Sequence, residues 1–363
     1  MRHHEQRATQ DLNTITETVA TMAEQVETVL TDAVHALLTN NQQLAHATVL
    51  ADHPINRKMR KIDRLCHAYI ATHLPSVRPL RLISSIIRIN IELERIGDYA
   101  VIICREGLTL SSPPSGLLGG ELETIASESG KMLHQAIESF NQRNAERAKA
   151  TIGMSQHMEH ALNNVYENLI DEDNDLKINH KDRYALFVVF NMLKRVADQA
   201  KNICEETIFA ITGETKAKKI YKLLFLDTDN HCLAPMAAAI ANQQFPNSAT
   251  YDCACQCQAD ELHPALEAFM HQRDVTTELP APKSLELSAK EQSDYHVIIS
   301  LQGNVSDYID NPPFHTVLQQ WDLTPIASHL DEQQTESAMK EAYRALSLQI
   351  RDLIEILHGK EAD

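Results

Sequence analysis

A fourteen-residue stretch occurs twice in the chain, at 93–106 and again at 193–206. The copies, LERIGDYAVIICRE and LKRVADQAKNICEE, are identical at seven of their fourteen positions. In each copy the apolar residues recur at helical spacing, as at Leu93, Ala100 and Ile103, which predicts a helix with one buried stripe. The chain is therefore expected to contain a duplicated helical unit.

An acidic pair lies on the first copy. Glu94 and Asp98 are four residues apart and therefore share a helix face. Two like charges at this spacing cost a few tenths of a kcal/mol, which a cation such as Mg²⁺, Mn²⁺, Ca²⁺ or iron would offset, and inward acidic residues hold metals in helical bundles. The alternative is a solvated charged face in which Arg88 and Arg95 supply the positive charge.

Length and charge limit the classes of function. A chain of 363 residues predicts two or three domains. The net charge of −17 argues against a nucleic-acid partner and against an anionic membrane surface as the docking site. No apolar run reaches spanning length and no signal-peptide core follows the first residues, so we expect no membrane insertion and a cytoplasmic location. The seven cysteines lack disulfide-framework spacing, which favours reduced thiols.

The first 214 residues follow one plan twice. Helical patterns cover 3–50 and 55–71, with an interruption expected at Asp52, His53 and Pro54. The helix with the acidic pair comes next, and three long antiparallel helices make a bundle. A turn-rich segment at 107–120 separates the halves. The second half is predicted to repeat the plan, with helices at about 121–141, 145–171 and 180–211.

The pattern changes after Ile220. Short apolar runs at 222–226 and 295–301 predict buried strands, with helical patterns between and after them at 236–244, 264–273 and 336–357. Alternation of strands and helices predicts an α/β domain with a parallel sheet. The expected fold class is therefore multidomain, all-α followed by α/β.

Four segments of the helical region resemble one family. They are RHHEQ near the start, DHPIN at 52–56, PLRLISSIIRINIELERIGDYA at 79–100 and AKNICEETIFAITGE at 200–214. Together they resemble the PhoU family of phosphate-uptake regulators over Met1–Glu214. The resemblance implies two tandem three-helix repeats, at 1–110 and 119–214. It also implies a regulator and not an enzyme, an adaptor that contacts the phosphate ABC transporter ATPase and a sensor histidine kinase. A homodimer is an expected oligomeric state.

The resemblance also implies a metal cluster on the third helix of each repeat. Its ligands in the first repeat are Glu94 and Asp98, for a divalent or trivalent ion that the sequence does not identify as iron, manganese, zinc or magnesium. In the second repeat Lys194 replaces the first acid and leaves Asp198, with Asn202 as a further oxygen ligand. A Lys194–Asp198 ion pair without metal is the alternative there.

The C-terminal region resembles a second family. Five segments carry the similarity: LLFLDTDNHCLAPMAAAI at 223–240, ELHP at 261–264, PKSLEL at 282–287, DYHVIISL at 294–301 and WDL at 321–323. They resemble low-molecular-weight tyrosine phosphatases and arsenate reductases, over a domain expected at 220–360. That family uses a C-x5-R-S loop, in which a thiolate lies among backbone N–H groups and an arginine holds the phosphoryl oxygens.

The residues of that loop are replaced here. Asp227 stands in place of the nucleophilic Cys, Leu233 in place of the Arg and Ala234 in place of the Ser, and Asp229 adds a second negative charge. We expect a catalytically inactive, phosphatase-like domain. The alternative is a phosphatase or an arsenate-reductase-like enzyme that uses Cys232 or Asp227. In one form of it, Asp227 and Asp229 act with Mg²⁺ as in haloacid-dehalogenase phosphatases.

Three cysteines alternate in CACQC. On a strand Cys253, Cys255 and Cys257 would point to one face, where thiolates bind Zn²⁺ or Cu⁺. The alternative is that they are small buried residues without a metal.

Overall fold

The computed structural model describes residues 2–155, 179–215, 219–228, 232–255, 262–275, 294–309, 316–326 and 331–359, with single positions in 158–169 and 279–292. The chain divides into two compact units, Met1–Lys216 and Ala217–Asp363. The first unit is helical and the second is α/β.

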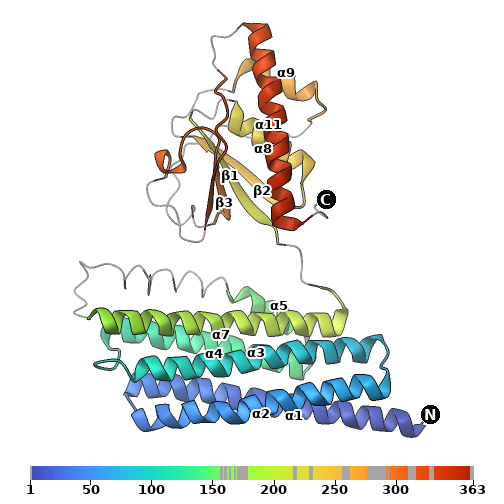
Figure 1. Ribbon diagram of the computed structural model, residues 1–363, viewed down its shortest axis with the longest axis vertical. Helices are drawn as coiled ribbons and strands as arrows, with labels where there is room; N and C mark the ends of the chain where they lie inside the picture. Colours follow the sequence, from blue (N-terminus) through green and yellow to red (C-terminus); the bar gives the residue numbers. More distant parts are fainter. Residues whose placement is uncertain are drawn as a thin grey trace. The chain divides into compact units, whose positions relative to one another are not determined.

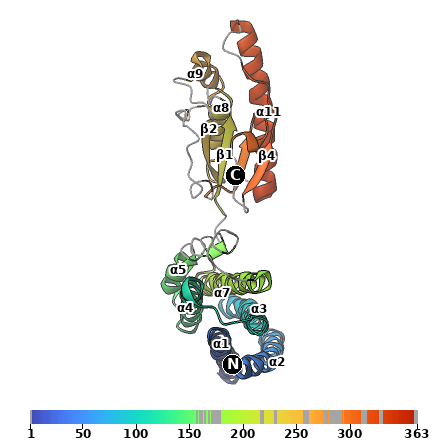
Figure 2. The ribbon, with the colours of Figure 1, turned by 90° about the vertical axis from the view of Figure 1, so that its left-hand side faces the viewer.

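The first unit is a bundle of long helices that lie side by side (Figure 1). Its helices are α1 (Arg2–Thr39), α2 (Gln42–His73), α3 (Val77–Gly107), α4 (Gly116–Asn141), α5 (Ala145–Gly153) and α7 (His180–Thr212). The most extensive packing joins α3 to α7, which carry the two copies of the repeated stretch. Figure 2 shows the helices of this unit nearly end on. Within the described part of the chain, no helix is long and apolar enough to cross a bilayer.

Helix boundaries differ from the sequence prediction at three places. One is the helix predicted at about 145–171, where α5 ends at Gly153 and most of the later residues lie outside those described. The interruption expected at residues 52–54 is wrong, because α2 continues through Pro54. The first break lies instead at Asn40, with φ of 52°, and Asn41, whose side chain caps α2 by accepting from the Leu44 N–H at 3.0 Å. Pro54 removes one backbone bond within the helix, but the tertiary packing of Ile55, which is fully buried, keeps the segment helical. Helix α4 begins at Gly116, inside the segment expected to be a turn.

The second unit contains a parallel sheet, as the sequence predicts, and the sheet has four strands, of which the apolar runs predicted β1 and β3. Its strands are β1 (Tyr221–Asp227), β2 (Ala249–Cys255), β3 (Val297–Ser300) and β4 (Val317–Gln320), in the order β2-β1-β3-β4. Its helices are α8 (Leu233–Gln244), α9 (Pro264–His271) and α11 (Glu332–His358), with the 3₁₀ turn η1 at Val305–Asp307. Side chains alternate across the sheet. Leu223 and Phe225 of β1 join the larger core with α8, α9 and α11, whereas Leu224 and Leu226 join a smaller core with Val305.

Candidate functional site

The acidic pair of α3 lies beside a third carboxylate from α2. Glu94 is half-buried and Asp98 is exposed. Asp52, one helix away, raises the pKa of both. The sequence analysis did not place Asp52 in the site, because its position depends on how α2 packs against α3.

Gly97 permits this close packing of α2 and α3. A Cβ atom added at Gly97 would lie 3.3 Å from Ile55 Cδ1 and 3.6 Å from Asp52 Oδ1. The first distance is tighter than an ordinary contact, so any larger side chain would push against Ile55 and then against Asp52. A glycine in a helix interior costs about 1 kcal/mol relative to alanine, and here it brings the carboxylate of α2 to the acidic face of α3.

Burial and like charge both act on the acidic pair. The pKa of Glu94 is raised by burial first, then by Asp98 and Asp52, while Arg95 lowers it. The pKa of Asp98 is raised by burial and by Asp52, while Arg105 lowers it. Burial and like charge thus act in one direction on both groups.

The two carboxylate oxygens of Asp52 differ in their hydrogen bonding. Its Oδ2 accepts a hydrogen bond from Asn56 Nδ2 at 2.6 Å, whereas Oδ1 is buried and has no hydrogen-bond partner among the residues that the structure describes. A buried acceptor without a partner costs about 1–3 kcal/mol, and more when charged. A cation bound at Oδ1 would remove that cost.

The arginines expected to compensate the acidic pair have other partners. Arg88 Nε lies 2.6 Å from Glu206 Oε1, and Arg95 Nη1 lies 3.4 Å from Glu92 Oε2. No ion pair to Asp52, Glu94 or Asp98 is formed by any residue that the structure describes. In this conformation, however, no three His, Cys, Asp or Glu side chains of the described residues are close enough together to hold a metal ion. Carboxylate oxygens are the ligands that a hard cation prefers. For such an ion to bind, the side chains of Asp52, Glu94 and Asp98 would have to move closer together.

The second copy has a different arrangement. Asp198 lines a cavity of about 120 Å³ together with Lys194 and Lys201, so that two ammonium groups share its surroundings. Asn202 points elsewhere, because its Nδ2 donates to Gln199 Oε1 at 3.2 Å and its side chain bonds to Glu92 on α3. The structure does not bring Asp198 and Asn202 together as ligands.

A polar seam joins α3 and α7. Gln199 Nε2 donates to the Tyr99 hydroxyl at 3.2 Å, and the Arg195 guanidinium lies 5.1 Å from the centre of the same ring. Burial raises the pKa of Glu92, while Arg95 and Asn202 lower it. Tyr99 and Gln199 occupy equivalent positions of the two copies but differ in type, whereas Arg195 corresponds to Arg95. The repeats therefore pair in part through a position at which they differ.

The duplicated cysteines are structural. Cys104 and Cys204 are buried free thiols. Burial raises their pKa to about 11 and about 12 respectively, so both stay protonated and unreactive at neutral pH.

In the α/β unit, the side chain that ends β1 bonds to the helix that follows it. Asp227 ends β1, is 1% exposed, and its Oδ2 accepts from the Ala234 N–H in the first turn of α8 at 2.9 Å. A carboxylate thereby occupies the helix N-terminus at which an oxyanion would bind. Cys232 is the N-cap residue of α8 and is buried, and Leu233 begins the helix. Asp229 lies outside the described residues.

Two of the three alternating cysteines lie on β2. Cys253 and Cys255 are buried two residues apart, and therefore on one face of the strand. Cys257 lies outside the described residues.

The helical unit is thus a duplicated antiparallel bundle with an acidic face on the third helix of its first repeat. Two segments, residues 19–107 and 122–207, match the family model of the PhoU domain. Each repeat of the helical unit therefore carries one match to the PhoU domain.

Individual proteins show the same relationship. The phosphate-specific transport system accessory protein PhoU of Serratia marcescens is 29% identical over 205 residues, which are 56% of this chain and 84% of the relative. The crystal structure of PhoU from Pseudomonas aeruginosa, at 28% identity and a TM-score of 0.54, covers 57% of this chain and 99% of its own. An arsenate reductase in the phosphate binding state covers 38% of this chain and 99% of its own, at 18% identity and a TM-score of 0.31. The α/β unit is assigned to the parallel-sheet α/β class by its own strand order and parallel pairing.

Proposed function

We propose that this chain is a metal-dependent regulator of phosphate transport that acts in the cytoplasm as an adaptor. The observation that carries the proposal is the bare, buried Asp52 Oδ1 beside Glu94 and Asp98 in a PhoU domain. Relatives that share this domain are named as accessory proteins of the phosphate-specific transport system. The partners proposed here are the phosphate ABC transporter ATPase and a sensor histidine kinase, which the helical unit contacts without entering the membrane.

The ion would be divalent or trivalent, held by Asp52, Glu94 and Asp98. It would supply positive charge that the described side chains do not supply, and would link α2 to α3 through their carboxylates. Asn56 would orient Asp52 by the hydrogen bond that it already donates. The second repeat has Lys194 and Lys201 beside Asp198, so the proposed metal site belongs to the first repeat.

The α/β unit would serve binding and not catalysis. Asp227 supports this role, because its carboxylate already accepts the Ala234 N–H that an oxyanion would need. A phosphate approaching this loop would meet a buried negative charge.

A second candidate function is an enzyme. Cys232 lies at the N-terminus of α8, where a thiolate is stabilised, and Asp227 is an alternative nucleophile. The test is turnover of an aryl phosphate, with and without Mg²⁺, and of arsenate with a thiol. The adaptor proposal expects no turnover above buffer, and activity abolished by Asp227→Asn or Cys232→Ser would establish the enzyme.

Co-purification tests the adaptor function itself. The full-length chain should retain the transporter ATPase and the sensor kinase in the presence of Mn²⁺ or Mg²⁺, and lose them in chelator. The triple variant Asp52→Asn, Glu94→Gln and Asp98→Asn should lose them in both conditions, while Glu17→Gln, an exposed acid of α1, should not. Equal retention of both partners by the triple variant would contradict a metal-dependent adaptor.

A further inference from the structure

A cavity with two arginines lies at the end of the bundle where the two repeats meet. Its volume is about 280 Å³. It is lined by Leu12, Arg78, Pro79, Leu82, Phe140, Arg143, Thr207, Ala210 and Ile211, which come from α1, α3, α4, α7 and the turn after α4. Both repeats build it, so neither PhoU domain contains it alone.

The interior of the cavity is apolar. Leu82 and Phe140 are each 8% exposed. Thr207 is buried and its hydroxyl already donates to the Ile203 carbonyl at 2.8 Å, so it offers a methyl group to the cavity without a free donor. Since a water molecule takes up ~30 Å³, the space suits a body of roughly nine non-hydrogen atoms.

The polar groups of the cavity are both cationic. Arg78 and Arg143 are exposed, and within the described ranges neither side chain forms a hydrogen bond or an ion pair. In a chain with a net charge of −17, two arginines without an acidic partner beside one apolar cavity make a local anion-attracting site.

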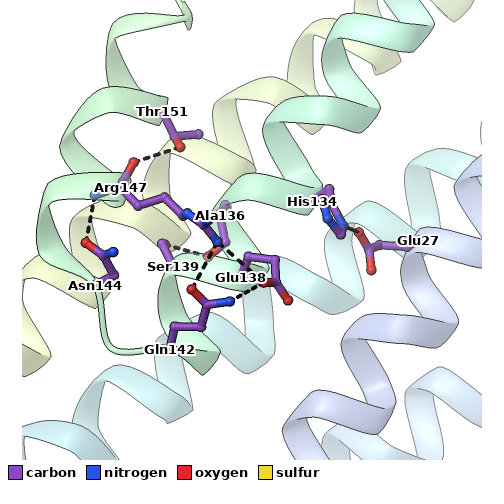
Figure 3. A network of polar contacts seen from close by, with 9 residues as sticks. All are labelled: Glu27, His134, Ala136, Glu138, Ser139, Gln142, Asn144, Arg147 and Thr151. Carbon is purple, nitrogen blue, oxygen red and sulfur yellow. Dashed lines mark hydrogen bonds and ion pairs between the residues drawn. The ribbon is translucent and has the colours of Figure 1, made fainter.

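Arg143 is held in place by the turn that carries it. Its backbone has φ of 51°, a left-handed conformation that non-glycine residues adopt at some cost. Figure 3 shows the contacts that stabilise this turn. Arg147 Nη1 donates to Gln142 Oε1 at 3.1 Å, and Gln142 Nε2 donates to Glu138 Oε2 at 2.5 Å. The backbone N–H of Arg147 donates to Asn144 Oδ1 at 3.0 Å. Glu138 and Gln142 bond to Arg147 and to each other and not to Arg143, which lines the cavity.

The neighbouring helix end does not oppose an anion. Helix α7 ends at Gly213, beyond Ile211, and its carbonyl end carries partial negative charge. The Arg81 guanidinium packs directly against Gly213, since a Cβ there would collide with its Nη1, and so offsets that charge. Arg81 is therefore a further positive charge at this end of α7.

We propose that this cavity binds an amphiphilic anion, a short apolar body that carries a phosphate or carboxylate group. The apolar body would enter between Leu82 and Phe140, and the anionic group would be held at the mouth by Arg78 and Arg143. A volume of about 280 Å³ admits one short chain and not the two acyl chains of a membrane lipid. The site is separate from the proposed metal site and does not depend on it.

Hexyl phosphate is the probe that tests this proposal, in isothermal titration with the full-length chain. It should bind more tightly than hexanol, which lacks the charge, and than inorganic phosphate, which lacks the apolar body. Arg78→Gln and Arg143→Gln should each weaken binding by roughly tenfold or more, since a charged hydrogen bond contributes that much, and salt should weaken it further. A matched control, Arg64→Gln with Arg351→Gln, removes two exposed arginines and should leave binding unchanged.

A cavity-filling variant separates the site from general charge. Ala210→Phe keeps both arginines but occupies the space, so it should abolish hexyl phosphate binding, with circular dichroism melting to verify the fold. Absent binding to the wild-type chain, equal binding of inorganic phosphate, or unchanged binding in the Arg78→Gln, Arg143→Gln double variant would each overturn the proposal. Vesicles of phosphatidic acid distinguish the source of the anion. Retention on vesicles without binding of soluble hexyl phosphate would replace it with a membrane contact.

Discussion

Asp52 is the residue that turns an acidic helix face into a candidate metal site. Spacing alone predicted that Glu94 and Asp98 share a face, since positions four apart on a helix must do so, and the family resemblance supplied their expected role as metal ligands. It placed Asp52 only in a helix interruption, because a contact between two helices leaves no trace in the periodicity of either one. A usable signal was present in DHPIN, where Asp52 and Asn56 are also four residues apart.

Asp98→Asn is expected to stabilise the metal-free protein at neutral pH. The folded-state pKa of Asp98 is raised above its ordinary value of 3.8, so the group favours the folded state at low pH and loses that contribution as the pH rises through its folded-state pKa. Removing the charge should gain a few tenths of a kcal/mol, since the group is exposed and screened. Thermal melting in chelator measures this.

The gain from Asp98→Asn should disappear as the pH is lowered towards 3.8, because the wild-type carboxyl is then protonated as well. Glu17→Gln removes the same charge from an exposed position on α1 and should change the melting temperature little. A loss of stability in Asp98→Asn at pH 7 would mean that the negative charge of Asp98 is already balanced by positive charge in the metal-free protein.

Asp227→Ala is expected to destabilise the α/β unit by about 1–2 kcal/mol, as loss of a helix cap does. The buried carboxylate accepts the Ala234 N–H, and alanine would leave that donor without a partner. Urea unfolding measures the change. Asp227→Asn keeps a side-chain oxygen that can accept the same bond, so it should cost less, and equal costs for the two variants would show that the contact with α8 does not contribute.

At the scale of elements, the sequence predicted most of what lies in long periodic segments. Helices α3 and α7 and strands β1 and β3 follow from their apolar patterns. Strand β4 was missed because VLQQ is short and three of its four residues are exposed. Its pairing with β3 depends on tertiary contacts, which the apolar pattern of the sequence does not indicate. The course of α2 through Pro54 was missed for a related reason, since packing of Ile55 outweighs the local cost of proline.

Tyr99→Phe tests whether the seam between α3 and α7 is a specific contact. It removes the hydroxyl that accepts from Gln199 and leaves a buried amide without that partner, at a cost of about 1 kcal/mol. A double-mutant cycle with Gln199→Leu should give a coupling energy of similar size. Additive effects of the two substitutions would mean that apolar packing alone joins the repeats.

At the scale of the whole molecule, the hydrophobic cores of the two units share no residue among those that the structure describes. The core of the first unit is built from its helices, and the larger core of the second from the sheet with α8, α9 and α11. The division matches the two compact units, Met1–Lys216 and Ala217–Asp363.

Two matched core substitutions test the independence of the units. Leu93, 1% exposed in α3, and Leu346, fully buried in α11, should each cost about 2–5 kcal/mol on change to alanine. Calorimetry of the full chain should show Leu93→Ala lowering one transition and Leu346→Ala lowering the other. A single transition that both variants lower equally would show that the units unfold together.

Metal content of the purified chain tests the central claim most directly. After dialysis against Mn²⁺, Fe²⁺, Zn²⁺ or Mg²⁺ and removal of free ion, elemental analysis should find bound metal in the wild-type chain and in Glu17→Gln. The triple variant Asp52→Asn, Glu94→Gln and Asp98→Asn should retain none at the first-repeat site. Metal bound equally by the wild type and the triple variant, or by neither, would contradict a site built on Asp52, Glu94 and Asp98.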